Sequence, residues 1–159
     1  MNQKNGLSGT VWLVDDDLSV LHMLQTLVES LQVDVHAFSC ANDFLAAYQP
    51  RSMECLVCDL RMPNIDGVEV QKRLKAKGVP LPIIFLTGFA EVDIAVQAMR
   101  DGALDFVQKP FSAHALLSKI QTGLGLSKVQ HTQWLELQGR QARIALLTPK
   151  LKFLRFSTP

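Results

Sequence analysis

Aspartates gather at two places in this sequence where an apolar run ends. The run VWLV is followed directly by Asp15, Asp16 and Asp17, and the run CLVC is followed by Asp59. Carboxylates that lie close together repel each other, and at least one tends to stay protonated unless a cation lies among them. Burying a charged Asp59 at the end of an apolar strand also costs free energy unless the group is paired. The aspartates therefore either lie at the start of a helix with only a structural role or bind a cation.

Five short apolar runs alternate along the chain with stretches of helical spacing. The runs are TVWLV (10–14), VDVHAF (33–38), CLVCD (55–59), PIIFLT (82–87) and LDFVQ (104–108). Between them, apolar residues recur every three or four positions, as on one face of an amphipathic helix. Strands that alternate with helices, without hairpin signals, indicate βαβ units with right-handed crossovers and a parallel sheet. We therefore expect an α/β fold whose functional groups lie at the carboxyl ends of the strands.

The side chains capable of chemistry would meet at that edge of the sheet. Asp15 and Asp16 close the first strand, Asp59 the third and Thr87 the fourth, while Lys109 follows the fifth. Carboxylates supply the oxygen ligands that Mg²⁺ prefers, with water at the remaining octahedral positions. A carboxylate at the position of Asp59 can attack phosphorus and form an aspartyl phosphate. Lys109 and Thr87 would then contact phosphoryl oxygens.

Single residues of this set also have ordinary structural explanations. Asp17 is expected to cap the helix that begins at Leu18, because its side-chain oxygen can accept a backbone N–H. A threonine at a strand end is commonly a β-branched strand residue, and a lysine before proline is commonly a solvated loop charge. Three acids, a hydroxyl and a lysine at the strand ends of one predicted fold nevertheless favour a site.

The motifs around these residues resemble the receiver domain of two-component response regulators. They are VDDD at 14–17, DLRMPNIDG at 59–67, LTG at 86–88 and KPF at 109–111, in the order and at the spacings of that family. Residues 86–111 are similar in particular to the FixJ branch of the FixJ/NarL-type transcriptional regulators. The resemblance implies a flavodoxin-like (βα)5 fold, a doubly wound parallel sheet of five strands in the order 2-1-3-4-5, with a C-terminal helical extension.

The resemblance also implies a metal site. Its cofactor is Mg²⁺, held by the side chains of Asp15, Asp16 and Asp59 and by the backbone carbonyl of Arg61. The repulsion between the aspartates is then the reason why the pocket favours a cation.

The resemblance further implies roles in phosphorylation and switching for four residues. Asp59 is the phosphoacceptor, Lys109 contacts the phosphoryl group, and the Lys109–Pro110 peptide bond is expected to be cis. Thr87 is the switch hydroxyl that moves toward the phosphoryl group. Phe106 is the switch aromatic that rotates into the space that Thr87 vacates, although core packing explains this phenylalanine equally well.

The implied partner is a sensor histidine kinase, and the implied output is a surface on the fourth helix, fifth strand and fifth helix, at about 91–122. Two chains would pair there, or through the C-terminal helix, after a shift between two packings. The predicted function is the regulatory half of a transcriptional response regulator, with self-catalysed phosphotransfer and autodephosphorylation as its only chemistry.

Two other functions are kept as alternatives to this one. The first is a stand-alone interaction module that phosphorylation controls without DNA binding. The second is a phosphatase or nucleotide-binding enzyme. This is disfavoured because neither G-x-G-x-x-G nor a Walker sequence follows the first strand, and the best nucleophile, Asp59, lies on the third.

Charge divides the chain into an acidic body and a basic end. Residues 1–126 carry 10 Lys and Arg against 14 Asp and Glu, whereas residues 127–159 carry six against one. We expect a receiver domain at 8–125, a helical linker at 126–148 and a short tail at 149–159. Within the linker, Gly139 is a weak point.

The end of the chain departs from the pattern of the family. ARIALLTP at 142–149 resembles the segment that leads into a helix-turn-helix domain in this branch, and only ten residues follow it. We therefore expect a truncated or diverged ending, and specific DNA binding only if such a domain were restored. Trp134, Leu137 and Ile144 would pack either on a partner or against their own domain.

Composition narrows the class of protein further. Apolar residues make up 48% of the 159 residues, which is enough for a core and argues against wholesale disorder. An odd cysteine count without a signal peptide suggests a cytoplasmic setting, and Cys55 and Cys58 are interpreted as core residues rather than as a zinc or redox pair. No window of 18 apolar residues occurs, so no membrane span is expected.

Overall fold

The computed structural model describes residues 9–157, with side chains described up to residue 147. Five parallel strands form one sheet in the order β2-β1-β3-β4-β5. They are β1 (Thr10–Val14), β2 (Asp34–Phe38), β3 (Glu54–Asp59), β4 (Ile83–Thr87) and β5 (Asp105–Gln108). Each predicted strand agrees with the observed one to within one residue at either end, and the predicted flavodoxin-like fold is confirmed. Residue 8 of the expected receiver domain and residues 158–159 of the expected tail lie outside the described part.

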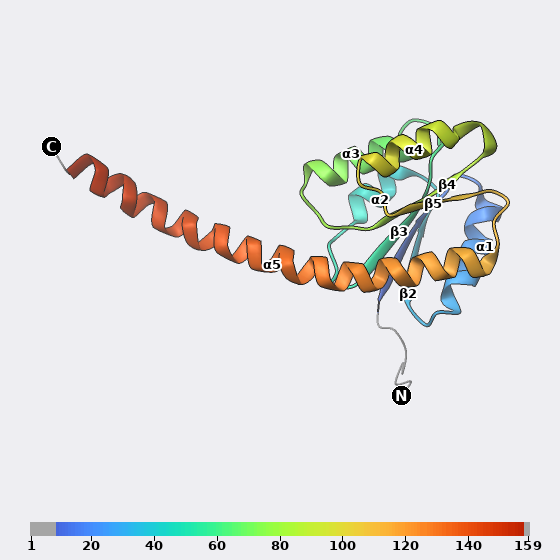
Figure 1. The fold of residues 1–159 in the computed structure, drawn as a ribbon, viewed down its shortest axis with the longest axis horizontal. Coiled ribbons are helices and arrows are strands. Elements are labelled where there is room, and N and C mark those ends of the chain that lie inside the picture. Colours follow the sequence, from blue (N-terminus) through green and yellow to red (C-terminus); the bar gives the residue numbers. More distant parts are fainter. Residues whose placement is uncertain (1–8, 158–159) are drawn as a thin grey trace.

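Helices cover both faces of the sheet (Figure 1). They are α1 (Leu18–Glu29), α2 (Ala41–Ala47), α3 (Gly67–Ala76), α4 (Val92–Arg100), which follows a short 3-10 turn η1 (Phe89–Glu91), and α5 (Ala113–Ser157). The buried residues of α1 and α5 pack on one face, and those of α2, α3 and α4 pack on the other. The strands are therefore buried on both sides, as expected for a parallel sheet between helical layers.

The strand β3 shows how one apolar run serves both faces. Successive side chains of a strand point to opposite sides, so Cys55 packs with the α1 and α5 layer and Cys58 with the α2, α3 and α4 layer. Both cysteines are fully buried. Burial raises the pKa of the Cys55 thiol to about 12 and also raises that of Cys58. The prediction that they are core residues is confirmed, since two thiols on opposite faces of a sheet cannot share a metal ion.

The helix α5 is 45 residues long and docks on the sheet only through its first part. Leu116, Ile120 and Leu124 are fully buried against the sheet. Gly123 allows a close approach, because a Cβ at this position would lie 2.8 Å from the Cys55 Sγ. The docked part therefore depends on a small residue where the helix crosses β3.

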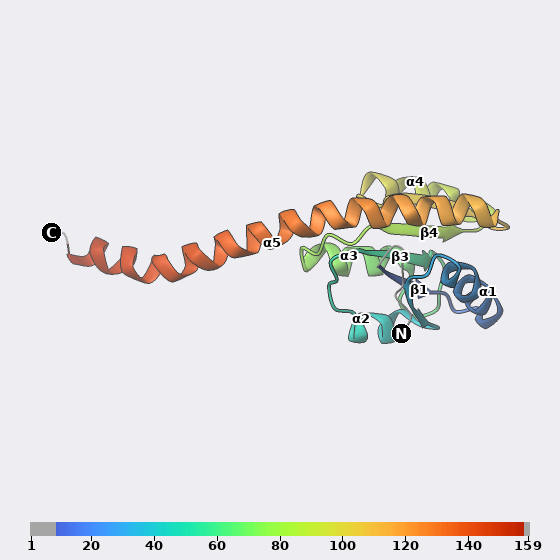
Figure 2. The same ribbon diagram turned by 90° about the horizontal axis from the view of Figure 1, so that it is seen from below.

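Beyond Ser127 the helix α5 projects away from the domain (Figure 2). The segment predicted as a separate linker is thus continuous with the last helix of the domain, and Gly139 does not interrupt it. Trp134 is half-buried and its ring lies beside that of His131 on the same helix. Leu137 and Ile144 are exposed, which is contrary to the alternative in which this segment folds back on its own domain. In the part of the chain that the structure describes, no helix has the length and apolar character to cross a membrane.

Candidate functional site

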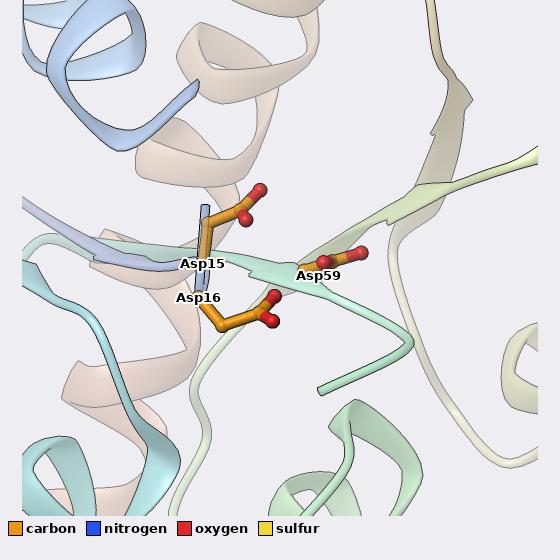
Figure 3. Close-up of side chains that lie close together, drawn as sticks. All are labelled: Asp15, Asp16 and Asp59. Carbon is orange, nitrogen blue, oxygen red and sulfur yellow. The ribbon is translucent and has the colours of Figure 1, made fainter. Parts of the chain in front are cut away.

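Three carboxylates meet at the carboxyl ends of β1 and β3, as predicted. The two strands are neighbours and pair Val14 with Cys58, so the residues that follow these two reach the same edge of the sheet. One carboxylate oxygen from each of Asp15, Asp16 and Asp59 lies within 4.8 Å of the others. Figure 3 shows the three side chains grouped at the strand ends. The arrangement offers several oxygen ligands from a small volume, as a hard divalent cation requires.

The three carboxylates differ in their exposure to water. Asp15 is fully buried, Asp59 is 9% exposed, and Asp16 is exposed. The pKa of Asp59 is raised to about 6, first by burial and then by the nearby charge of Asp15, while Lys109 opposes the shift. Negative charge on Asp59 is therefore unfavourable unless more positive charge enters the cluster.

Lys109 lies between two of the carboxylates. Its Nζ is 3.0 Å from Oδ2 of Asp15 and 3.6 Å from Oδ2 of Asp59. Its backbone N–H donates to the carbonyl of Thr87, and the peptide bond to Pro110 is cis, as predicted. Burial opposes the charge of Lys109, but the hydrogen bonds and charges of Asp15 and Asp59 together raise its pKa. One lysine thus faces three acids, which leaves the cluster short of positive charge.

The two residues assigned to the switch lie on the neighbouring strands β4 and β5. Thr87 is fully buried, and its hydroxyl donates to the carbonyl of Gly88 at 3.1 Å. Phe106 is partly buried and packs against the core beneath α4. Thr87 stands at the same sheet edge as Asp59, because β3 pairs Asp59 with Leu86. In this structure the Thr87 hydroxyl is therefore bonded to the backbone of the next residue.

Local turns and caps hold the loops around the cluster. Asp17 caps α1 by accepting the N–H groups of Ser19 and Val20, as predicted from the sequence. The loop after Asp59 closes at Gly67, where a Cβ would lie only 2.7 Å from the carbonyl oxygen of Asp59. Glycine is therefore needed for α3 to begin directly beside the end of β3.

Arg61 was singled out in the sequence for its backbone carbonyl, and that role stays a prediction. A hydrogen bond from the Arg61 backbone lowers the pKa of Asp59, against the larger effect of burial. The Arg61 side chain pairs with Glu91 at 3.2 Å. Sequence reasoning did not identify Glu91, because an acidic residue in a turn four positions after a threonine carries no specific signal.

The five-stranded parallel sheet with a carboxylate cluster at its carboxyl edge defines the class of α/β fold, and comparison with known proteins gives the family. The family described as response regulator receiver domain matches residues 11–121. The transcriptional regulatory protein FixJ of Bradyrhizobium diazoefficiens is 37% identical over 142 residues, which cover 89% of this chain and 69% of that protein. This chain belongs to the response regulator receiver domain family.

Two further relatives agree with this assignment. The transcriptional regulatory protein TdiR of Thauera aromatica is 36% identical over 147 residues, which cover 92% of this chain and 65% of that protein. The solved structure of the response regulator StyR has a TM-score of 0.70 and 38% identity, and the match covers 95% of this chain and 71% of that one. The chain thus spans about two thirds of the length of these relatives.

Proposed function

We propose that this chain is the phosphoacceptor of a two-component system and receives its phosphoryl group from a sensor histidine kinase on Asp59. The observation that carries the proposal is the position of the Asp59 carboxylate at a strand end, beside Asp15 and 3.6 Å from the Lys109 Nζ. A carboxylate is a weak nucleophile that needs a nearby positive charge to stabilise the transferring phosphoryl group. Lys109 supplies part of that charge.

In the proposed transfer, the phosphoryl group passes directly from the donor histidine to the Asp59 carboxylate. An oxygen of Asp59 attacks phosphorus, and the bond from phosphorus to the imidazole nitrogen of the kinase histidine breaks, leaving its electron pair on nitrogen. Water later attacks the same phosphorus and releases inorganic phosphate, which restores the Asp59 carboxylate. The chemistry of the chain is thus self-catalysed phosphotransfer and autodephosphorylation, not turnover of a separate substrate.

The acidic cluster fits Mg²⁺ as a cofactor. The ion would be held by the side chains of Asp15, Asp16 and Asp59 and by the backbone carbonyl of Arg61. Three carboxylate oxygens within 4.8 Å and a pKa of about 6 for Asp59 both mark a deficit of positive charge. When bound, a divalent cation neutralises charge that develops on the transferring phosphoryl group.

The proposed switch connects Asp59 to the surface formed by α4, β5 and α5. The Thr87 hydroxyl, which donates to the Gly88 carbonyl in this structure, would turn to a phosphoryl oxygen. Phe106 would then move into the space left by Thr87 and alter the packing of α4. Ile94 and Val96 expose apolar surface on α4, and this surface or the projecting part of α5 would form a homodimer. 

The transcriptional role is proposed from the relatives, two of which are called transcriptional regulatory proteins. Specific DNA binding would require a helix-turn-helix domain beyond the residues that make up this fold. The proposed setting is cytoplasmic, where a kinase and the regulated genes are both accessible. The proposed contribution of this chain to transcription is the phosphorylation-controlled pairing of two receiver domains.

The test is labelling by acetyl phosphate with and without Mg²⁺. We expect Mg²⁺-dependent labelling of the wild type and a loss of at least about 100-fold in Asp59→Asn, since an amide cannot take the phosphoryl group. Asp66→Asn is the matched control, because Asp66 caps α3 outside the carboxylate cluster and should leave labelling intact. A sizing column on the same samples reports pairing. Equal labelling of wild type and Asp59→Asn would contradict the proposal.

A further inference from the structure

An ion pair joins the two loops that flank the carboxylate cluster. Arg61 lies two residues after Asp59, in the loop between β3 and α3, and Glu91 lies four residues after Thr87, at the end of η1. The Nε of Arg61 is 3.2 Å from Oε1 of Glu91. The contact thus links the loop of the phosphoacceptor to the loop of the switch threonine.

The acidic partner of this pair is held in a defined place. The Glu91 side chain is only 11% exposed, whereas that of Arg61 is 75% exposed. The carboxylate fills room left by the missing side chain of Gly88, where a Cβ would lie 2.5 Å from Oε2 of Glu91. The Glu91 backbone N–H also donates to the Gly88 carbonyl at 3.3 Å. Because a nearly buried carboxylate needs a counter-charge, Glu91 fixes the position of the Arg61 guanidinium.

A second pair of the same residue types shows what is particular about this one. Arg73 and Glu69 also lie 3.2 Å apart, with side chains 48% and 44% exposed. They are four residues apart on α3 and join only neighbouring turns of one helix. Such an exposed pair contributes little. The Arg61–Glu91 pair instead connects segments that are 30 residues apart in sequence and has one buried partner.

The pair continues a connection that the backbone begins. The N–H of Leu60 donates to the carbonyl of Leu86 at 3.0 Å, where β3 and β4 end. Past that bond the two chains separate into their loops. Arg61 is the residue after Leu60, and its pair with Glu91 connects the two loops just beyond that hydrogen bond. Arg61 is also the residue whose carbonyl is proposed to bind the metal.

We propose that Arg61 and Glu91 are positioning residues for the metal site: through their ion pair, they hold the Arg61 peptide so that its carbonyl can serve as a ligand. This inference rests on the proposed function, because it concerns the same Mg²⁺ site. Neither side chain is a ligand. Their effect on Mg²⁺ is carried by the placement of a backbone oxygen.

Two substitutions separate a positioning role from a simple effect of charge, because the two explanations predict different directions of change in Mg²⁺ affinity. If the side chains act only through their electric field, Glu91→Gln weakens Mg²⁺ binding and Arg61→Gln strengthens it. If they act through their pairing, both substitutions weaken binding, and the double variant binds no more weakly than either single one. Gly88→Ala gives a third route, since its Cβ would displace the Glu91 carboxylate without changing any charge. The extended φ and ψ of Gly88, −82° and 174°, suit alanine.

The experiment is calorimetric titration of Mg²⁺ into the full chain. We expect Arg61→Gln, Glu91→Gln, Gly88→Ala and the double variant each to bind about three- to tenfold more weakly than the wild type. Arg61→Lys keeps the charge but not the guanidinium Nε that contacts Glu91, so its affinity should lie between those of the wild type and Arg61→Gln. Arg73→Gln and Glu69→Gln are the matched controls and should leave the affinity unchanged.

The outcomes separate this inference from the proposed function. Opposite signs for Arg61→Gln and Glu91→Gln, or unchanged affinity in both, would overturn the positioning role while leaving the Mg²⁺ site intact. Absence of Mg²⁺ binding by the wild type would overturn the proposed function itself. Melting curves of every variant accompany the titrations. Arg61 is exposed, so Arg61→Gln tests the pair even if Glu91→Gln proves unstable.

Discussion

The two ends of the parallel sheet bury carboxylates with opposite consequences. At the carboxyl end, Asp15 and Asp59 share a single lysine and lie beside a third acid. At the amino end, Glu54 is 1% exposed and accepts hydrogen bonds from Trp12 Nε1 at 3.0 Å and from the hydroxyl of Tyr48. Burial raises the pKa of Glu54, but these two donors oppose the shift, whereas the charge of Asp15 reinforces the shift at Asp59.

The difference shows that burial of an acid does not by itself identify a functional site. Glu54 is surrounded by donors that stabilise its charge, and Arg51 lies over the Trp12 ring at 5.6 Å from its centre. Glu54 lies on β3 and joins that strand to Trp12 on β1 and to Tyr48 at the end of α2. Asp59 lies beside Asp15 and Asp16, and the positive charge of Lys109 is shared between Asp59 and Asp15. A surplus of like charge around a buried acid is therefore a better indicator of a functional site than burial alone.

The largest change in stability is expected from Glu54→Ala. This substitution leaves Trp12 Nε1 and the Tyr48 hydroxyl buried without an acceptor, which should cost about 2–4 kcal/mol of the free energy of unfolding. Urea unfolding measures the loss, with Glu54→Gln as the milder control that still offers an acceptor. Acetyl phosphate labelling of the folded Glu54→Ala protein should stay within about twofold of the wild type. A loss of labelling in the folded variant would contradict the claim that Glu54 serves stability alone and that the chemistry belongs to the carboxyl end.

A pH dependence is expected at the carboxyl end without Mg²⁺. The pKa of Asp59 is raised from 3.8 to about 6 in the folded chain, so the native state binds the proton more tightly than the unfolded state does. Stability from this group should therefore fall as pH rises from about 4 to 6, by a total of order 1 kcal/mol. Urea unfolding of wild type and Asp59→Asn across this range isolates the effect. A wild type that gains stability relative to Asp59→Asn over that range would contradict the sign.

The smallest effect is expected from Ser127→Ala at the amino end. The Ser127 hydroxyl is fully buried and accepts the backbone N–H of Glu54 at 2.9 Å, where α5 leaves the domain. Loss of this one bond should cost about 1 kcal/mol in urea unfolding. Thr132→Ala is the control on the exposed part of α5, where the threonine hydroxyl bonds only to its own helix. Equal effects of the two substitutions would show that α5 is not held at this point.

Much of the fold and the carboxylate cluster could be predicted because their signals are local. Apolar runs such as VWLV mark buried strands of a parallel sheet, and the aspartates that follow them mark the strand ends. The order of the strands came from the resemblance to the receiver family, and with that order Asp15 and Asp59 had to meet. The cap at Asp17 could be predicted for the same reason, since it depends on the next three residues.

The rest depends on contacts between distant parts of the chain. Trp12 and Glu54 are 42 residues apart, and nothing near Glu54 indicates that an indole reaches it. The Arg61–Glu91 pair likewise depends on how two loops face each other. The continuity of α5 through Gly139 was missed because glycine lowers helix propensity by only about 1 kcal/mol, which does not force an end.

The most direct measurement is the thermal unfolding of wild type and Asp59→Asn with and without Mg²⁺. If the carboxyl end carries uncompensated negative charge, Asp59→Asn should melt about 2–4 °C above the wild type without Mg²⁺. Mg²⁺ should then raise the melting temperature of the wild type more than that of Asp59→Asn. A variant that melts below the wild type, together with a wild type that does not respond to Mg²⁺, would contradict the account of this end as a cation site.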